Sequence, residues 1–125
     1  MEIDTVIDQG AEFFLAGDVF DLDVMASRAF CVEVGDNQLE GFFVRAENGD
    51  LFAYKNSCPH TGAPLNWTPD QFLTSSGRYI QCSIHGAMFK LESGECFAGP
   101  CSGKFLQAMK VVEREGQAFV GAESL

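Results

Sequence analysis

From Phe30 onward, the hydrophobic and polar positions follow a β pattern of short strand-like runs, the first of which alternates as a half-buried strand does. Phe30, Val32 and Val34 begin the pattern, and the segments 39–46 and 51–56 continue it. Later stretches of the same kind cover residues 78–81, 87–91, 105–112 and 117–120. This part of the chain therefore predicts an all-β fold.

Turn residues separate these predicted strands at short intervals. Asn48-Gly49 lies between two of them and is a strong hairpin signal, because both residue types tolerate positive φ. Gly35-Asp36-Asn37, Ser93-Gly94 and Glu115-Gly116 mark further turns. With 13 glycines in 125 residues, this spacing is typical of a small antiparallel β-sandwich or barrel.

The first 25 residues follow a different pattern. Apolar residues within 5–16 are spaced as in a weak helix, whereas Phe20, Leu22 and Val24 alternate with aspartates as in a strand. The segment contains seven Asp and Glu residues and no Lys or Arg, so it carries most of the net charge of −10. We therefore divide the chain by composition into an acidic N-terminal extension (1–25) and a domain (26–125). The acidic residues would form a solvated face or steer a basic partner.

The composition excludes several classes of protein. The length suits one domain, and the negative charge disfavours binding to nucleic acid and to anionic membrane surfaces. The N-terminus has no basic region typical of a signal peptide, and no apolar run is long enough to span a membrane. Five cysteines, an odd number, argue against a fully paired disulfide framework. We expect a cytoplasmic protein with reduced thiols.

The only two histidines in the chain each lie close to a cysteine. The two groups are Cys58-Pro59-His60 and Cys82-Ser83-Ile84-His85, and 21 residues separate His60 from Cys82. This arrangement predicts a metal site. Four Cys and His ligands suit zinc, although zinc motifs usually leave roughly two to four residues between the ligands of a pair, and Cys58 and His60 have one. The alternative is a [2Fe–2S] cluster in which each segment gives one ligand to each iron.

The residues around these ligands resemble a known family. Residues 58–65 (CPHTGAPL) and 82–89 (CSIHGAMF), with the later Ser93-Gly94 and Gly99-Pro100, resemble the Rieske iron–sulfur family over roughly residues 28–121. The resemblance implies an antiparallel β-sandwich or barrel with a small cluster-binding subdomain. In that subdomain, two ligand loops and a third loop containing proline surround the cluster.

The resemblance also implies a role for each ligand. Cys58 and Cys82 would bind the buried iron, His60 and His85 would bind the exposed iron, and Pro100 and its neighbours would shield the cluster. The implied function is that of a stand-alone Rieske-type ferredoxin, which passes one electron from a reductase to an acceptor such as an oxygenase. Two alternatives remain: a small Rieske subunit of a larger reductase or oxygenase complex, and a non-redox module that binds zinc or a cluster.

Catalysis by the chain alone is not expected. Once His60 and His85 are assigned as ligands, no histidine remains for the mononuclear iron of an oxygenase or for a Ser/His/Asp triad. The prediction is an electron-transfer component rather than an enzyme.

Some positions depart from the high-potential branch of the family. Ala63 and Ile84 stand where those members carry a disulfide, and Ala87 and Phe89 stand where they carry Ser and Tyr. Hydroxyl donors to the cluster sulfurs raise the potential, so the departures indicate the low-potential branch. The interval between the ligand loops is also longer than the family norm, with the excess at residues 66–77.

Five further residues have a structural interpretation, and four of them also have a functional one. Cys31 is expected to be a small buried hydrophobic residue within a strand. Cys96 and Cys101 flank Gly99-Pro100 as two thiols or as a local disulfide. Trp67 and Phe72 would pack in the core or form a docking surface for a redox partner.

Overall fold

The computed structural model describes all residues except 1–4, 35, 58–64, 66–70, 83–85 and 122–125. In this part of the chain, eleven strands form three antiparallel sheets, which confirms the predicted all-β class. Among the described residues there is no helical segment that could span a bilayer.

Two four-stranded sheets make up the larger part of the molecule. The first sheet has the order β1 (Thr5–Asp8), β2 (Ala11–Asp18), β11 (Gln117–Gly121) and β10 (Val111–Arg114). The second has the order β3 (Ser27–Val34), β4 (Asn37–Arg45), β5 (Leu51–Lys55) and β9 (Ala108–Met109). The turns predicted at 47–50 and at Glu115-Gly116 connect neighbouring strands of these sheets.

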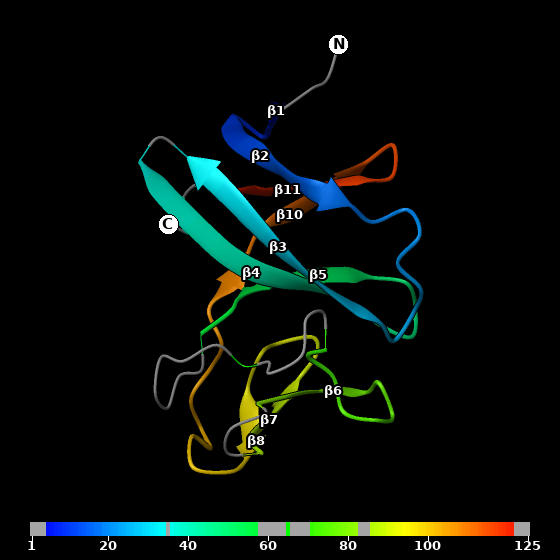
Figure 1. Cartoon of the computed structure of the whole chain (residues 1–125), viewed down its shortest axis with the longest axis vertical. Coiled ribbons are helices and arrows are strands. Elements are labelled where there is room, and N and C mark those ends of the chain that lie inside the picture. The colour runs from blue at the N-terminus through cyan, green and yellow to red at the C-terminus, as the bar shows by residue number, and fades with distance from the viewer. Residues whose placement is uncertain (1–4, 35, 58–64, 66–70, 83–85, 122–125) are drawn as a thin grey trace.

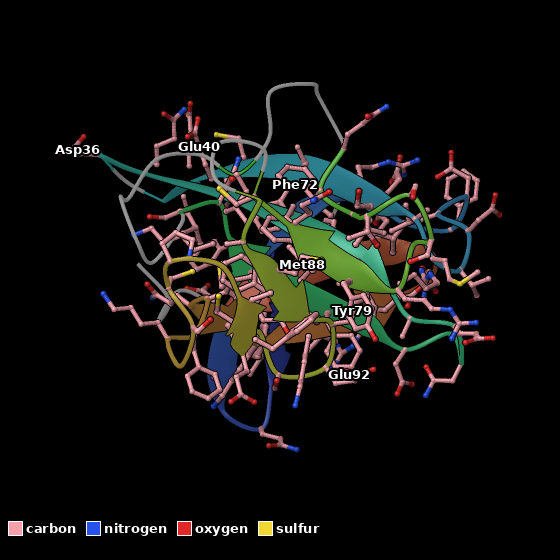
Figure 2. The ribbon with its side chains drawn as sticks, turned by 90° about the horizontal axis from the view of Figure 1, so that it is seen from below. Asp36, Glu40, Phe72, Tyr79, Met88 and Glu92 are labelled. Carbon is pink, nitrogen blue, oxygen red and sulfur yellow. The ribbon has the colours of Figure 1, made fainter. Side chains whose placement is uncertain are left out.

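The third sheet is smaller and lies at one end of the molecule. It has the order β6 (Tyr79–Gln81), β7 (Met88–Lys90) and β8 (Cys96–Ala98). Figure 1 shows it below the two larger sheets, and Figure 2 looks onto its outer face, where Met88 and Tyr79 lie. The sheet is therefore a separate small layer, as expected for a cluster-binding subdomain.

The N-terminal segment differs from its prediction. Residues 5–16, predicted as a helix, instead contribute strands β1 and β2, joined by Gln9 and Gly10 at φ angles of 51° and 82°. The predicted strand at Phe20–Val24 is also wrong, because this segment is a turn in which Phe20 and Val24 are exposed. Strand β2 pairs with β11, so residues 11–18 belong to a sheet that the C-terminal strands share. The division at residue 25 is one of charge and stays a proposal.

Strands β4 and β5 are buried on both faces and separate two hydrophobic cores. Phe43 of β4 and Ala53 of β5 are paired and face the core between the larger sheets. Phe42 and Tyr54 are the next pair and face the opposite core, which lies against the small sheet. Burying one large apolar side chain contributes about 1.5–3 kcal/mol to the free energy of folding, so the side chains on both faces of β4 and β5 stabilise the fold.

The core beneath the small sheet contains residues from distant parts of the chain. The ring of Phe72 stacks on Phe42 with a centroid distance of 4.2 Å and an interplanar angle of 6°. Phe72 is completely buried, which confirms the packing interpretation, whereas Trp67 lies outside the described residues. Figure 2 shows Phe72 beside the small sheet. The second half of the 66–77 interval thus anchors the chain before β6 begins.

Arg45, at the end of β4, ties the acidic N-terminal segment to the sheets. Its guanidinium donates hydrogen bonds to the carbonyls of Leu22 (2.9 Å), Val19 (3.0 Å) and Gly49 (3.1 Å). It also forms a salt bridge with Glu113 of β10 at 3.2 Å. A single side chain therefore satisfies three backbone carbonyls and joins both large sheets.

Tyr54 connects the larger sheets to the small one by a hydrogen bond. Its hydroxyl donates to the carbonyl of Leu91, just after β7, at 2.5 Å. Burial, with a contribution from the nearby Glu92 carboxylate, raises the pKa of Tyr54 to about 12. The hydroxyl thus stays protonated in the folded protein at pH values where an exposed tyrosine would ionise.

Replacing Tyr54 with phenylalanine should lower the free energy of unfolding by about 1–2 kcal/mol near pH 8, because the Leu91 carbonyl loses its donor. The wild-type stability should fall as the pH rises from about 10 to 12, since only the unfolded tyrosine ionises there. The two proteins should therefore converge at high pH. Urea midpoints measured at pH 8 and at pH 11 test this, and an unchanged difference between the proteins would contradict it.

Candidate metal centre

Of the four predicted ligands, Cys82 lies in the described part of the chain. Cys58, His60 and His85 lie outside the described residues. Cys82 follows directly after β6, and its side chain is 0% exposed. It belongs to the core cluster beneath the small sheet, beside Ala87 and Leu65.

Backbone hydrogen bonds place Cys82 at the base of a tight hairpin. The Cys82 N–H donates to the Ala87 carbonyl at 2.8 Å, and the Gly86 N–H donates to the Cys82 carbonyl at 2.9 Å. Gly86 has a φ of +68°, a conformation that glycine adopts without strain. The hairpin joins β6 to β7, so the second predicted ligand segment begins and ends at fixed positions.

The first predicted ligand segment is also fixed where its ends are described. The side-chain oxygen of Asn56 accepts a hydrogen bond from the Leu65 N–H at 2.8 Å, and the Asn56 N–H donates to the Glu40 carbonyl at 3.0 Å. Asn56 therefore bridges the segment that precedes Cys58 to the residue that follows Pro64. Leu65 is fully buried in the same cluster as Cys82, so the two predicted ligand segments adjoin one core.

Asn56 was not among the residues that the sequence pattern pointed to. The available signal was its position two residues before Cys58, because asparagine side chains in loops often bond to nearby backbone N–H groups.

A third loop, residues 99–103, packs on the second ligand hairpin. A Cβ atom at Gly99 would lie 2.8 Å from the Ala87 Cα atom and 3.1 Å from the Ala87 Cβ atom, and the φ of Gly99 is +98°. The Ser102 hydroxyl donates to the Gly99 carbonyl at 2.9 Å, which holds the turn. Pro100 itself is exposed. The close contact of this loop with the hairpin is made at Gly99.

The remaining cysteines differ from one another in environment. Cys31 is exposed, which corrects its prediction as a buried residue. Cys96 and Cys101 are buried in the same core cluster as Cys82. The structure has both as thiols, and the Cys101 Sγ–H donates to the Cys96 Sγ atom at 3.0 Å.

The described residues fit an iron–sulfur centre. Cysteine sulfur is a soft donor that suits iron–sulfur clusters, and Cys82 lies at the base of a hairpin inside an apolar core. Apolar surroundings exclude water, and they are one of the levers by which a protein tunes a cluster. The Gly99 loop adds a cover on the side of Ala87.

Comparison with known proteins agrees with this arrangement. A family model for the Rieske [2Fe-2S] domain matches residues 14–115. No curated protein sequence matches the chain.

Three solved structures have a similar fold. The ferredoxin of carbazole 1,9a-dioxygenase from Nocardioides aromaticivorans IC177 has a TM-score of 0.64 and 22% identity, with 86% of this chain and 95% of that chain covered. A chain in the complex of reduced oxygenase and oxidized ferredoxin in carbazole 1,9a-dioxygenase has a TM-score of 0.63 and 23% identity, with 86% and 99% covered. The terminal oxygenase of carbazole 1,9a-dioxygenase from Novosphingobium sp. KA1 has a TM-score of 0.67 and 17% identity, with 86% and 29% covered.

The family match covers most of the chain, including the whole small sheet and the loops around Cys82. The chain therefore belongs to the Rieske [2Fe-2S] domain family, and its cofactor is a Rieske [2Fe–2S] cluster.

Proposed function

We propose that this protein is a one-electron carrier, a Rieske-type ferredoxin that accepts an electron from a reductase and delivers it to an acceptor oxygenase. The observation that carries the proposal is the extent of the similarity. The chain spans 95% of a ferredoxin but 29% of a terminal oxygenase, so the resemblance to the oxygenase is confined to a part of that protein. On this ground we assign the chain the role of a carrier within an oxidoreductase system.

Four residues would hold the cluster. Cys58 and Cys82 would bind one iron and His60 and His85 the other, and the bound cluster supplies a site that gains and loses a single electron. The chain keeps Cys82 on a hairpin closed by two backbone hydrogen bonds. Such bracing limits the rearrangement that a change of charge at the site would cause.

The nature of the partners is part of the proposal. One of the similar structures is a complex of an oxygenase with a ferredoxin, and this makes an oxygenase our choice of acceptor. The net charge of −10 favours partners with basic surfaces, because opposite charges accelerate association. The Arg28 guanidinium pairs with Asp21 at 2.8 Å and lowers the pKa of that carboxyl, so part of the acidic segment's charge is already compensated.

We place the carrier in the low-potential branch. Ala87 and Phe89, at the positions that carry hydroxyls in high-potential members, are both fully buried. Neither side chain can donate a hydrogen bond to a cluster sulfur. A reduced cluster carries an extra negative charge, so missing donors lower its potential.

Replacing Ala87 with serine should raise the reduction potential. If the new hydroxyl stabilises the reduced cluster by about 1.4 kcal/mol more than the oxidised one, the one-electron potential rises by about 59 mV. Ala118 is equally buried but lies in the other core, so Ala118→Ser is the matched control and should leave the potential unchanged. Voltammetry of both holoproteins measures the effect. Equal potentials in the wild type and Ala87→Ser would count against the hydrogen-bond argument.

Spectroscopy with a redox titration tests the proposed function itself. A His-ligated [2Fe–2S] protein is red-brown and, when reduced, gives an electron paramagnetic resonance signal with a low average g-value, whereas a zinc protein is colourless. We expect uptake of one electron per chain and rapid reduction by a flavin-dependent reductase of an oxygenase system. A colourless holoprotein, or a coloured one that no such reductase reduces, would contradict the proposal.

A further inference from the structure

We propose that Cys96 and Cys101 form a reversible disulfide that closes the third loop over the cluster site, with a low-molecular-weight disulfide as the oxidant. Neither residue belongs to the predicted ligand set. The proposal does not depend on the electron-carrier function.

The two thiols are already in contact. Their Sγ atoms lie 3.0 Å apart, and each residue is 1% exposed. A disulfide bond is about 2.05 Å long, so bond formation needs an approach of about 1 Å. That displacement is within the range of side-chain rotation at a turn and does not require unfolding of β8.

The backbone holds the two residues in this position. The Gly103 N–H donates to the Cys96 carbonyl at 3.0 Å, and the Cys96 N–H donates to the Lys104 carbonyl at 2.8 Å. The Lys104 N–H in turn donates to the Cys101 carbonyl at 2.9 Å. The loop thus folds back on β8, and the proximity of the sulfur atoms follows from the main chain.

The surroundings indicate which thiol reacts first. Pro100 and Ser102, on either side of Cys101, are exposed, whereas Cys96 lies within β8. A small opening of the turn would therefore expose Cys101 before Cys96. Its thiolate attacks one sulfur of the small disulfide and releases one small thiol, leaving a mixed disulfide on Cys101.

The second step closes the ring. The Cys96 thiolate attacks the Cys101 sulfur, breaks the mixed disulfide and releases the second small thiol. In sum, the cysteine pair loses two protons and two electrons, and the small disulfide gains both to become two thiols. Excess dithiol reductant drives the same steps backwards.

The disulfide would act on the cluster site through Gly99. Gly99 lies between the two cysteines in sequence and packs on Ala87 of the ligand hairpin. Oxidation would fix the ends of the segment that carries Gly99 and so hold it against the hairpin. Cytosolic disulfides of this kind are usually transient and redox-sensing.

Peptide mapping of the holoprotein tests the proposal. Trypsin cleaves after Lys90 and Lys104, so one peptide, residues 91–104, carries Cys96 and Cys101 and no other cysteine. The holoprotein is treated with oxidised glutathione, quenched in acid, denatured and alkylated with N-ethylmaleimide. We expect the mass of this peptide to fall by two hydrogens and the peptide to take up no maleimide. When the oxidised protein is treated with dithiothreitol before alkylation, the same peptide should take up two maleimides.

Cys31 is the internal control. It is exposed and lies on a separate tryptic peptide, residues 29–45, where glutathionylation would show that the oxidant has acted. If Cys31 is glutathionylated while the 91–104 peptide still takes up two maleimides, the proposal is overturned. In Cys96→Ser or Cys101→Ser, the peptide should carry either one maleimide or one glutathione on its remaining cysteine, and Cys31→Ser should behave as the wild type.

Release of iron to a chelator tests the effect on the third loop. Oxidation should slow the loss of visible absorbance severalfold in the wild type and in Cys31→Ser, and it should have no effect in Cys101→Ser. An oxidised wild type that loses its colour as fast as the reduced protein would overturn the idea that the disulfide holds the loop closed, whatever the peptide map shows.

Discussion

Cys82→Ala protein is expected to be purified without the visible absorption of an iron–sulfur cluster, and its iron content should fall to background. Cys82 is the predicted ligand whose position the structure describes, and it is fully buried at the base of the β6–β7 hairpin. Because binding of a metal centre contributes directly to folding, the variant should also unfold at a lower denaturant concentration. Iron analysis and a urea titration monitored by circular dichroism measure the two effects.

A second buried cysteine provides the matched control. Cys96 lies in the same core cluster as Cys82 and is similarly buried, but it is not a predicted ligand. Cys96→Ala therefore removes the same atoms from the same core and should retain the cluster and its colour. If both variants lose iron equally, packing rather than ligation explains the loss. If Cys82→Ala keeps a full complement of iron, the assignment of Cys82 as a ligand is wrong.

The strands that the sequence predicted best are those whose partners are close in the chain. Strands β3, β4 and β5 follow one another through short turns, and Asn48-Gly49 marked one of these turns correctly. The burial of Phe42, Phe43 and Val44 in succession could not be predicted from alternation, because it requires a core on each side of β4. That second core exists only because the small sheet packs there.

The N-terminal strands were missed because their main partner is distant. Strand β2 pairs with β11, about a hundred residues later in the chain, and no local pattern records such a pairing. Its apolar run from Phe13 to Ala16 also fits the spacing of a helix as well as that of a strand. Gln9-Gly10 is a weaker hairpin signal than Asn-Gly or Asp-Gly, so the turn residues did not indicate a β-hairpin in place of the helix.

Alternation along β3 accounts for the exposure of Cys31. Phe30 and Val32 are buried, and the alternation of the strand then places Cys31 on the opposite face. Strand β3 is an edge strand of its sheet, and that face is exposed at Cys31. The alternation that identifies the strand therefore also predicts that the Cys31 side chain is exposed.

At the candidate site, residue chemistry was easier to predict than packing. The pairing of both histidines with cysteines indicated the metal centre without any structure. The supporting contacts of Asn56 with Leu65 and of Gly99 with Ala87 join segments whose distance in space the sequence does not give. A glycine before a proline is an ordinary turn signal, and only the fold shows that Gly99 also packs against the hairpin.

Gly99→Ala adds a single methyl group and should nevertheless destabilise the folded protein strongly. The new Cβ would lie 2.8 Å from the Ala87 Cα atom, and the backbone at φ +98° is strained for any residue with a side chain. The left-handed conformation costs about 1–2 kcal/mol, and overpacking costs typically about 1–3 kcal/mol more. The free energy of unfolding should fall by about 2–5 kcal/mol, with faster release of iron to a chelator.

Gly103→Ala separates the two causes. Gly103 lies in the same loop with a similar φ of +90°, but a Cβ atom there would meet nothing within 4 Å. This variant should therefore show the backbone strain alone, about 1–2 kcal/mol, and retain its iron as the wild type does. The difference between the two variants then measures the contact between Gly99 and the ligand hairpin. If urea midpoints and iron-release rates are the same in both, the third loop does not support the hairpin through Gly99.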